Sequence, residues 1–252
     1  MDLSVVIICK NDAGGIERTL QSVKGLDCDV LVYDSGSTDG SVEVAKRFGV
    51  RVAEGEWEGY GTNRFKAAQL AKFDWILMLD TDEIIDEELR ESLKKLDCNK
   101  EKQVYNIRYK NFIGNKLIRY GEWGNDSHIR LGNRKGVETD SEIVHEKLFL
   151  QPGLEIKQIK GYILHYTVKN IQDYTQKTMN YAMLSAEKYQ RLGKRATSLH
   201  ILFSPFYTFL KNYFFKLGFL DGREGFICAR MTAWYTFLKY SRLIELNKLG
   251  GK

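Results

Sequence analysis

The 252-residue sequence contains few prolines, few cysteines and no long uninterrupted hydrophobic run. Two prolines and 22 glycines, without a collagen period or a heptad repeat, exclude fibrous and coiled-coil proteins. The four cysteines lie far apart and form no C-x-x-C pair, which excludes a zinc knuckle and the usual redox motif. We expect reduced thiols in a globular protein that is soluble or bound at a membrane surface.

The sequence also lacks signals for export and for nucleic-acid binding. The N-terminus leads into an apolar run of seven residues, without the basic region or the small-residue cleavage site of a signal peptide. A net charge of +5 is too small to indicate nucleic-acid binding by itself. We therefore expect a cytoplasmic protein that does not bind nucleic acid.

The first hundred residues alternate short apolar runs with helical patterns, which is typical of β-α-β units around a parallel sheet. Strands are predicted over 3–9, 30–33, 50–53 and 75–79, with helices around Ile16, over 42–48 and 62–71, and after an N-cap at Asp86. Residues 103–166 predict a mixed or antiparallel extension. Residues 171–192, 199–217 and 222–246 predict helices, so we expect an α/β domain over 1–168 and a helical extension over 169–252.

Acidic residues follow three of the predicted strands, namely Asp12, Asp34 and the pair Asp80 and Asp82. Ligands of open α/β sheets bind beyond the carboxyl ends of the strands, so these acids are candidate ligand-binding residues. A carboxylate at the position of Asp34 can accept hydrogen bonds from a ribose or a base, and its alternative role is to cap a turn.

Asp80 and Asp82 are two residues apart in a segment predicted to be extended, which would point both side chains to one side. Two carboxylates that face solvent are suited to bind Mg²⁺ or Mn²⁺, with substrate phosphates as the further ligands. The alternative is a solvated acidic turn before a helix. The sequence lacks G-x-G-x-x-G after the first strand, a P-loop, H-E-x-x-H and G-x-S-x-G, so an acid-lined nucleotide site is the remaining interpretation.

Three segments in this order resemble the glycosyltransferase family 2 domain of GT-A fold: S-V-V-I-I over 4–8, Y-D-S-G-S-T-D-G-S over 33–41 and L-M-L-D-T-D-E over 77–83. Later positions resemble the lipopolysaccharide core β-glucosyltransferase subgroup: Trp123, Arg130, Leu131, Arg134, 144–146 and 218–225. The resemblance covers nearly the whole chain. It implies an α/β, Rossmann-like GT-A fold with a helical C-terminal extension.

The resemblance also implies roles for the acids. Asp34 would contact the base or ribose, Asp80 the ribose or sugar, and Asp82 the Mg²⁺ or Mn²⁺ that bridges the donor diphosphate. Arg64 would hold the nucleotide or diphosphate, with a surface helix charge as its alternative, and Asp12 would lie in the same nucleotide-sugar site. A divalent cation and a guanidinium would stabilise the negative charge that develops on the departing diphosphate.

Inverting transfer also needs a carboxylate that takes the proton of the acceptor hydroxyl. Many family 2 enzymes have a Glu-Asp dipeptide there, and the nearest equivalent here is His145-Glu146, so Glu146 is the predicted base. The competing carboxylates are Asp126, Asp140 and Glu142. Trp123, Arg130 and His145 are predicted to bind the acceptor, although Trp123 and His145 are also compatible with ordinary packing.

Residues 199–240 hold 13 of the 31 aromatic residues together with scattered Lys and Arg. Polar residues interrupt the longest apolar stretch, so it predicts an interfacial amphipathic helix pair rather than a spanning helix. A helical layer on the sheet and a dimer contact are the alternatives.

These features predict an inverting, metal-dependent glycosyltransferase. It would move a hexose, with UDP-glucose as the favoured donor, to a lipid-linked glycan or lipopolysaccharide core on the cytoplasmic face of the inner membrane. Two alternatives remain open at this stage: a catalytically silent nucleotide-sugar-binding module at the membrane, and a sugar-phosphate nucleotidyltransferase.

Overall fold

The computed structural model describes residues 1–139, 148–150 and 152–249 and divides into two compact units. The first unit comprises Met1–Tyr109 and Ser127–His165, and the second comprises Lys110–Asp126 and Tyr166–Lys252. Residues 110–126 thus group with the C-terminal helices, although they lie within the range 1–168 that the sequence assigned to the α/β domain. All four cysteines are free thiols, as expected.

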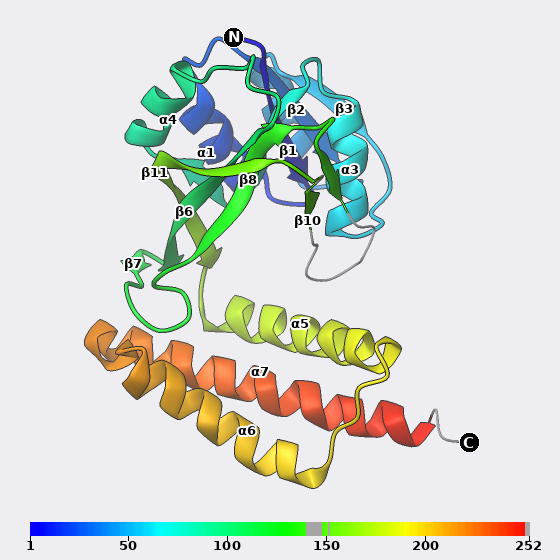
Figure 1. The fold of residues 1–252 in the computed structure, drawn as a ribbon, viewed down its shortest axis with the longest axis vertical. Coiled ribbons are helices and arrows are strands. Elements are labelled where there is room, and N and C mark those ends of the chain that lie inside the picture. Colours follow the sequence, from blue (N-terminus) through cyan, green and yellow to red (C-terminus); the bar gives the residue numbers. More distant parts are fainter. Residues whose placement is uncertain (140–147, 151, 250–252) are drawn as a thin grey trace. The chain divides into compact units, whose positions relative to one another are not determined.

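The first half of the chain alternates strands and helices (Figure 1). Its elements are β1 (Leu3–Cys9), α1 (Ala13–Val23), β2 (Asp29–Asp34), α2 (Ser41–Arg47), β3 (Arg51–Glu54), α3 (Tyr60–Gln69), β4 (Trp75–Asp80), β5 (Glu83–Ile85) and α4 (Glu87–Lys94). The later strands are β6 (Gln103–Ile113), β7 (Lys116–Leu117), β8 (Ser127–Asn133), β9 (Val137–Thr139), β10 (Leu148–Leu150) and β11 (Glu155–Val168).

The described strands form a large mixed sheet in the order β3-β2-β1-β4-β8-β6-β11-β5, and β9 pairs with β10 separately. Strands β1 to β4 run parallel to one another, whereas β8 pairs antiparallel with both β4 and β6. This arrangement confirms the α/β class and the antiparallel extension expected from the sequence.

The two faces of β1 contribute to two hydrophobic clusters, because successive side chains of a strand point to opposite faces. Leu3, Val5 and Ile7 pack with residues of α1, α2 and α4, and Val6 and Ile8 pack with residues of α3. Figure 1 shows α1 and α4 on one side of the sheet and α3 on the other. Burial on both faces explains the uninterrupted apolar run, and it fixes the strand ends that carry the acids.

The second unit contains α5 (Ile171–Arg191), α6 (Ser198–Leu210), a π-helical turn (Lys211–Phe215), a 3₁₀ turn (Gly218–Asp221) and α7 (Gly222–Leu249). Helix α7 packs along both α5 and α6. The helix predicted over 199–217 is interrupted after Leu210 by the π-helical turn. None of the helices in the described parts of the chain is both long enough and apolar enough to cross a bilayer.

Candidate active site

The parallel register places two predicted site residues on either side of the end of β1. Asp34 at the end of β2 pairs with Cys9, and Asp80 at the end of β4 pairs with Ile8. Neighbouring strands are about 4.8 Å apart, so the two residues lie roughly 10 Å apart across the carboxyl edge of the sheet. The strand order therefore brings together acids that are 46 positions apart in the sequence.

The loop after β1 is joined to the turn after β2 by side-chain hydrogen bonds. The backbone N–H of Asn11 donates to Ser37 Oγ at 2.8 Å, and the N–H of Thr38 donates to Asn11 Oδ1 at 2.8 Å. Asp39 Oδ2 accepts from the first N–H of α1, at Ala13, at 2.9 Å. Asp39 thus caps α1 from a different loop, which a local sequence pattern does not reveal.

Asp34 caps its own turn with one oxygen and leaves the other without a partner. Its Oδ2 accepts from the N–H groups of Gly36 and Ser37 at 3.0 and 2.8 Å. The residue is only 2% exposed, and Oδ1 has no hydrogen-bond partner among the described residues. Since a buried acceptor without a donor is costly, Oδ1 is suited to a ligand donor.

Asp80 is held by two arginines. Arg64 on α3 contacts both carboxylate oxygens through Nη2, at 2.8 and 2.5 Å, and Arg130 Nη2 lies 3.3 Å from Oδ2. Burial by itself would raise the pKa of Asp80, but the charges of Arg64 and Arg130 outweigh it and hold the pKa well below its usual range. Arg64 is therefore a paired site residue rather than a solvated helix charge.

Glu83, in the next strand, connects this group of residues and was not predicted as a site residue. It is fully buried, and its Oε1 accepts from Arg130 Nη2 at 2.9 Å and from the Tyr109 hydroxyl at 3.0 Å. Its Oε2 accepts from the N–H of Asp80 at 3.0 Å. Burial raises the pKa of Glu83, although Arg130 acts in the opposite direction. Glu83 therefore fixes Arg130 and the backbone at Asp80 together.

Asp82 has different neighbours from Asp80, because residues 81 and 82 form a turn rather than an extended segment. Asp82 Oδ2 lies 3.6 Å from His165 Nε2 on β11. Burial alone would lower the pKa of His165, but its hydrogen bond to Asp82 and the nearby acids raise the pKa above its usual value. Asp82 and His165 bring a carboxylate oxygen and an imidazole nitrogen together.

Asp12 lies at the start of α1, close to the same turn. A Cβ atom at Gly15 would meet the Asp12 carboxylate and would lie 2.7 Å from the carbonyl oxygen of Thr81. The Thr19 hydroxyl donates to the carbonyl oxygens of Thr81 and Glu83, both at 2.9 Å. Helix α1 thus supports the turn that carries Asp82.

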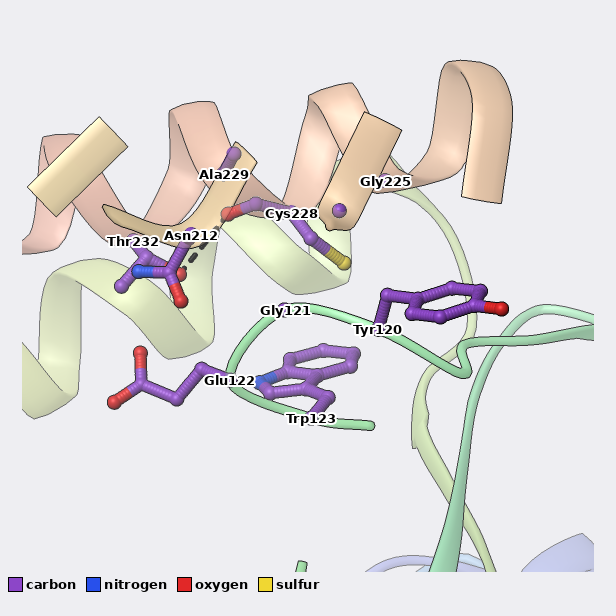
Figure 2. Close-up of a pocket in the computed structure, with 10 residues that line it drawn as sticks. Tyr120, Gly121, Glu122, Trp123, Asn212, Gly225, Cys228, Ala229 and Thr232 are labelled. Atoms are coloured by element: carbon purple, nitrogen blue, oxygen red, sulfur yellow. Dashed lines mark hydrogen bonds between the residues drawn. The ribbon is translucent and has the colours of Figure 1, made fainter. Parts of the chain in front are cut away.

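Trp123 belongs to the second unit and is half-buried there. Its ring centroid is 5.3 Å from that of Tyr174, and its carbonyl oxygen accepts from Asn111 Nδ2 at 3.1 Å. Figure 2 shows Trp123 beside a small pocket that Glu122 and Asn212 also line. Asn212 is buried, and its Oδ1 has no partner among the described residues.

Two predicted residues, His145 and Glu146, lie outside the described residues, as do the competing carboxylates Asp140 and Glu142. The competitor Asp126 lies in the second unit, where its Oδ2 accepts from Asn111 Nδ2 at 3.2 Å. The catalytic base therefore stays a prediction.

Glu83, Tyr109 and His165 are the residues that sequence reasoning missed. The D-T-D-E segment contains Glu83, but its partners Tyr109 and Arg130 are 26 and 47 residues away. His165 is 83 positions from Asp82, and its only local signal is a polar residue within an apolar strand. In the described parts of the chain, no three His, Cys, Asp or Glu side chains could hold a metal ion by themselves.

Several known proteins resemble this chain in sequence. The model of glycosyl transferase family 2 matches residues 4–155, which is more than half of the chain. An uncharacterized glycosyltransferase of Rickettsia typhi is 27% identical, over 97% of this chain and 87% of the relative. The lipopolysaccharide core biosynthesis glycosyltransferase LpsC of Rhizobium meliloti is also 27% identical, over 99% of this chain and 94% of its own length.

Similarity to solved structures is weaker. Glucosyl-3-phosphoglycerate synthase of Mycobacterium tuberculosis, solved with Mn²⁺, uridine diphosphate and glucosyl-3-phosphoglycerate, is 26% identical over 44% of this chain and 43% of that chain, with a TM-score of 0.35. TarS of S. aureus is 14% identical over 97% of this chain and 55% of that chain, with a TM-score of 0.46.

Proposed function

Since this chain belongs to glycosyl transferase family 2, we propose that it is an inverting hexosyltransferase that uses a nucleoside diphosphate sugar. UDP-glucose is the favoured donor, and the acceptor is a sugar of a lipid-linked glycan or lipopolysaccharide core. The similarity to LpsC along nearly the whole chain supports this acceptor class. The observation that carries the proposal is that Asp34 and Asp80 end neighbouring strands at one edge of the sheet, with Asp82 in the turn that follows Asp80.

In this proposal Asp34 and Asp80 bind the nucleoside and sugar. The unpartnered Oδ1 of Asp34 accepts from a donor on the base or ribose. A carboxylate offers about four acceptor positions, and the arginines supply three contacts to Asp80, so room remains for one sugar hydroxyl. Arg64 lies against this site and adds positive charge near the diphosphate, and Asp12 borders it.

Asp82 and His165 would hold the divalent cation. A carboxylate and an imidazole fit Mn²⁺, and Mg²⁺ fits through the carboxylate, with diphosphate oxygens and water completing the coordination. When bound, the cation supplies charge stabilisation for the departing diphosphate. The chain would contribute two ligands, Asp82 in the turn that Thr19 supports and His165 on β11.

We propose Glu146 as the base that takes the proton from the acceptor hydroxyl. Trp123, His145 and Arg130 are the proposed acceptor-binding residues. Arg130 already holds Asp80 and Glu83, so its contribution includes positioning the donor site. The acceptor class implies that the enzyme works as a peripheral protein on the cytoplasmic face of the inner membrane.

The test is a transfer assay with UDP-glucose, Mn²⁺ and a lipopolysaccharide-core acceptor, with product stereochemistry read by NMR. The proposal predicts a β-linked product, loss of transfer in Glu146→Gln and normal UDP binding by that variant. Glu88→Gln, which alters an exposed carboxylate on α4, is the control and should retain transfer. Metal-dependent UDP binding without transfer to any acceptor would instead indicate a silent binding module.

A further inference from the structure

The apolar surface of α6 is turned outward. Its exposed residues Leu199, Leu202, Phe203, Phe206 and Tyr207 follow the spacing i, i+3, i+4, i+7, i+8, which defines one face of a helix. Leu202 and Phe206 are 66% and 63% exposed, and no residue of α6 is fully buried. A helix of a soluble domain normally turns this face to the core, so the face needs another partner.

The chain after α6 continues this surface. Phe214 and Phe215 are 52% and 78% exposed, and they lie in the π-helical turn at the end of α6. Leu217 follows with φ of +58°, a left-handed conformation that is uncommon for leucine, and its side chain is also exposed. We define the docking face as the exposed stripe of α6 together with Phe214, Phe215 and Leu217.

The chain segment that contains the docking face carries charge of one sign. The segment 188–220 contains no Asp or Glu, and it contains six basic residues: Lys188, Arg191, Lys194, Arg195, Lys211 and Lys216. Lys211 and Lys216, which flank Phe214 and Phe215, are both exposed. Asp221, the next acid, is buried and accepts from the N–H groups of Arg119 and Tyr120, so it does not offset this charge at the surface.

We infer that the docking face binds an anionic lipid bilayer, with α6 lying in the interface and Lys211 and Lys216 at the level of the headgroups. Aromatic and leucine side chains beside lysines and arginines are the composition of interfacial helices, and acidic headgroups complement the basic segment. This inference rests on the proposed function in its choice of a membrane, and it adds the face and the lipid charge.

A second copy of this chain fits the face less well. In a two-fold symmetric dimer the same patch meets itself, so each basic segment would face an identical one. No acidic residue within 188–220 is available to compensate this repulsion. A dimer through α6 is therefore the competing outcome of the test.

The test measures co-sedimentation with vesicles of phosphatidylcholine alone or with phosphatidylglycerol. We expect binding to the anionic vesicles, weakened by salt, and at least about tenfold weaker binding to the neutral ones. The double variant Leu202→Glu/Phe206→Glu and the double variant Lys211→Gln/Lys216→Gln should each lose at least about tenfold in affinity. Ile171→Glu is the matched control, because Ile171 is 60% exposed on α5, and it should bind as the unaltered protein does.

Circular dichroism and Mn²⁺-dependent UDP binding report whether each variant is folded. Equal binding to neutral and anionic vesicles, or unchanged binding by a folded α6 variant, would overturn the inference. The inference would also be overturned if the protein bound no vesicles and light scattering showed a dimer that Leu202→Glu/Phe206→Glu dissociates. Vesicle binding with no transfer to any acceptor would contradict the proposed function and leave the docking face intact.

Discussion

Glu83 and Arg130 form an ion pair of 2.9 Å inside the first unit, and the carboxylate of Glu83 is completely buried. The same guanidinium reaches Asp80, and its Nε donates to the Tyr109 hydroxyl at 2.7 Å. Breaking one partner of a buried pair leaves the other charge uncompensated. The pair therefore links the stability of the sheet to the position of the candidate donor site.

Replacing Glu83 with Gln should destabilise the protein strongly. The variant keeps the shape of the side chain but removes the nearer of the two carboxylates that pair with Arg130, while Asp80 remains at 3.3 Å. We expect a cost of about 3 kcal/mol, at the lower end for a broken buried pair. Urea unfolding measures the loss. Glu91→Gln is the control, because Glu91 pairs with Lys94 at the surface, and its unfolding midpoint should stay unchanged. Equal midpoints for the two variants would contradict the structural role of the pair.

The neighbouring glycines of α1 should respond in opposite ways to alanine. Gly14 is exposed, with nothing within 4 Å of an added Cβ, so Gly14→Ala should stabilise the helix by about 0.5–1 kcal/mol. Gly15 is buried against Asp12 and the Thr81 carbonyl, so Gly15→Ala should cost about 1–3 kcal/mol through overpacking. Thermal unfolding distinguishes them, and two stabilised variants would show that this contact is not close.

The substitution Asp34→Asn distinguishes the role of the turn-capping oxygen Oδ2 from that of the unpartnered oxygen Oδ1. The amide oxygen can keep the hydrogen bonds from the N–H groups of Gly36 and Ser37. The amide nitrogen replaces Oδ1, so a hydrogen-bond donor would stand where the ligand also presents a donor. We expect unchanged melting without ligand and at least about tenfold weaker UDP binding by calorimetry. Asp27→Asn, at a fully exposed carboxylate, should bind normally. Normal UDP affinity in Asp34→Asn would remove Asp34 from the nucleotide site.

Substitutions at two histidines that contact Tyr109 test whether His165 is the second metal ligand. The rings of His128 and His165 lie 5.1 and 5.8 Å from that of Tyr109, both edge-to-face, but His165 also contacts Asp82. His165→Gln should weaken Mn²⁺-supported UDP binding by about 10–100-fold. His128→Gln should leave it nearly unchanged. If both variants lost affinity equally, packing on Tyr109 rather than metal binding would explain the effect.

The sequence predicted the sheet edge well because its signals are local. Strands buried on both faces give continuous apolar runs, so β1, β2 and β4 were located within one residue at each end. Asp86 was recognised as an N-cap from its own position, and its Oδ1 accepts from the N–H of Leu89 at 2.9 Å. The family was expected from the resemblance of segments 4–8, 33–41 and 77–83, and the family model that matches residues 4–155 confirms it.

The sequence did not predict the contacts between the site residues. Arg64 was expected to hold the nucleotide or diphosphate, which stays a prediction, and the structure pairs it with Asp80 from α3, which packs on β1 and β2. The junction at Leu210 was missed because the apolar pattern continues through a π-helical turn that changes the helical phase. Long-range partners such as His165 depend on strand order, which local periodicity does not specify.

The most direct test is calorimetric titration of UDP into the protein with Mn²⁺ and with a chelator, in the unaltered chain and in Asp82→Asn. We predict Mn²⁺-dependent binding that Asp82→Asn weakens by at least about tenfold. Asp97→Asn is the unaffected control, because its side chain is 43% exposed and pairs with Lys100. Equal UDP affinity with Mn²⁺ and with the chelator, or full Mn²⁺-dependent affinity in Asp82→Asn, would contradict a nucleoside diphosphate site built from the acids at this sheet edge.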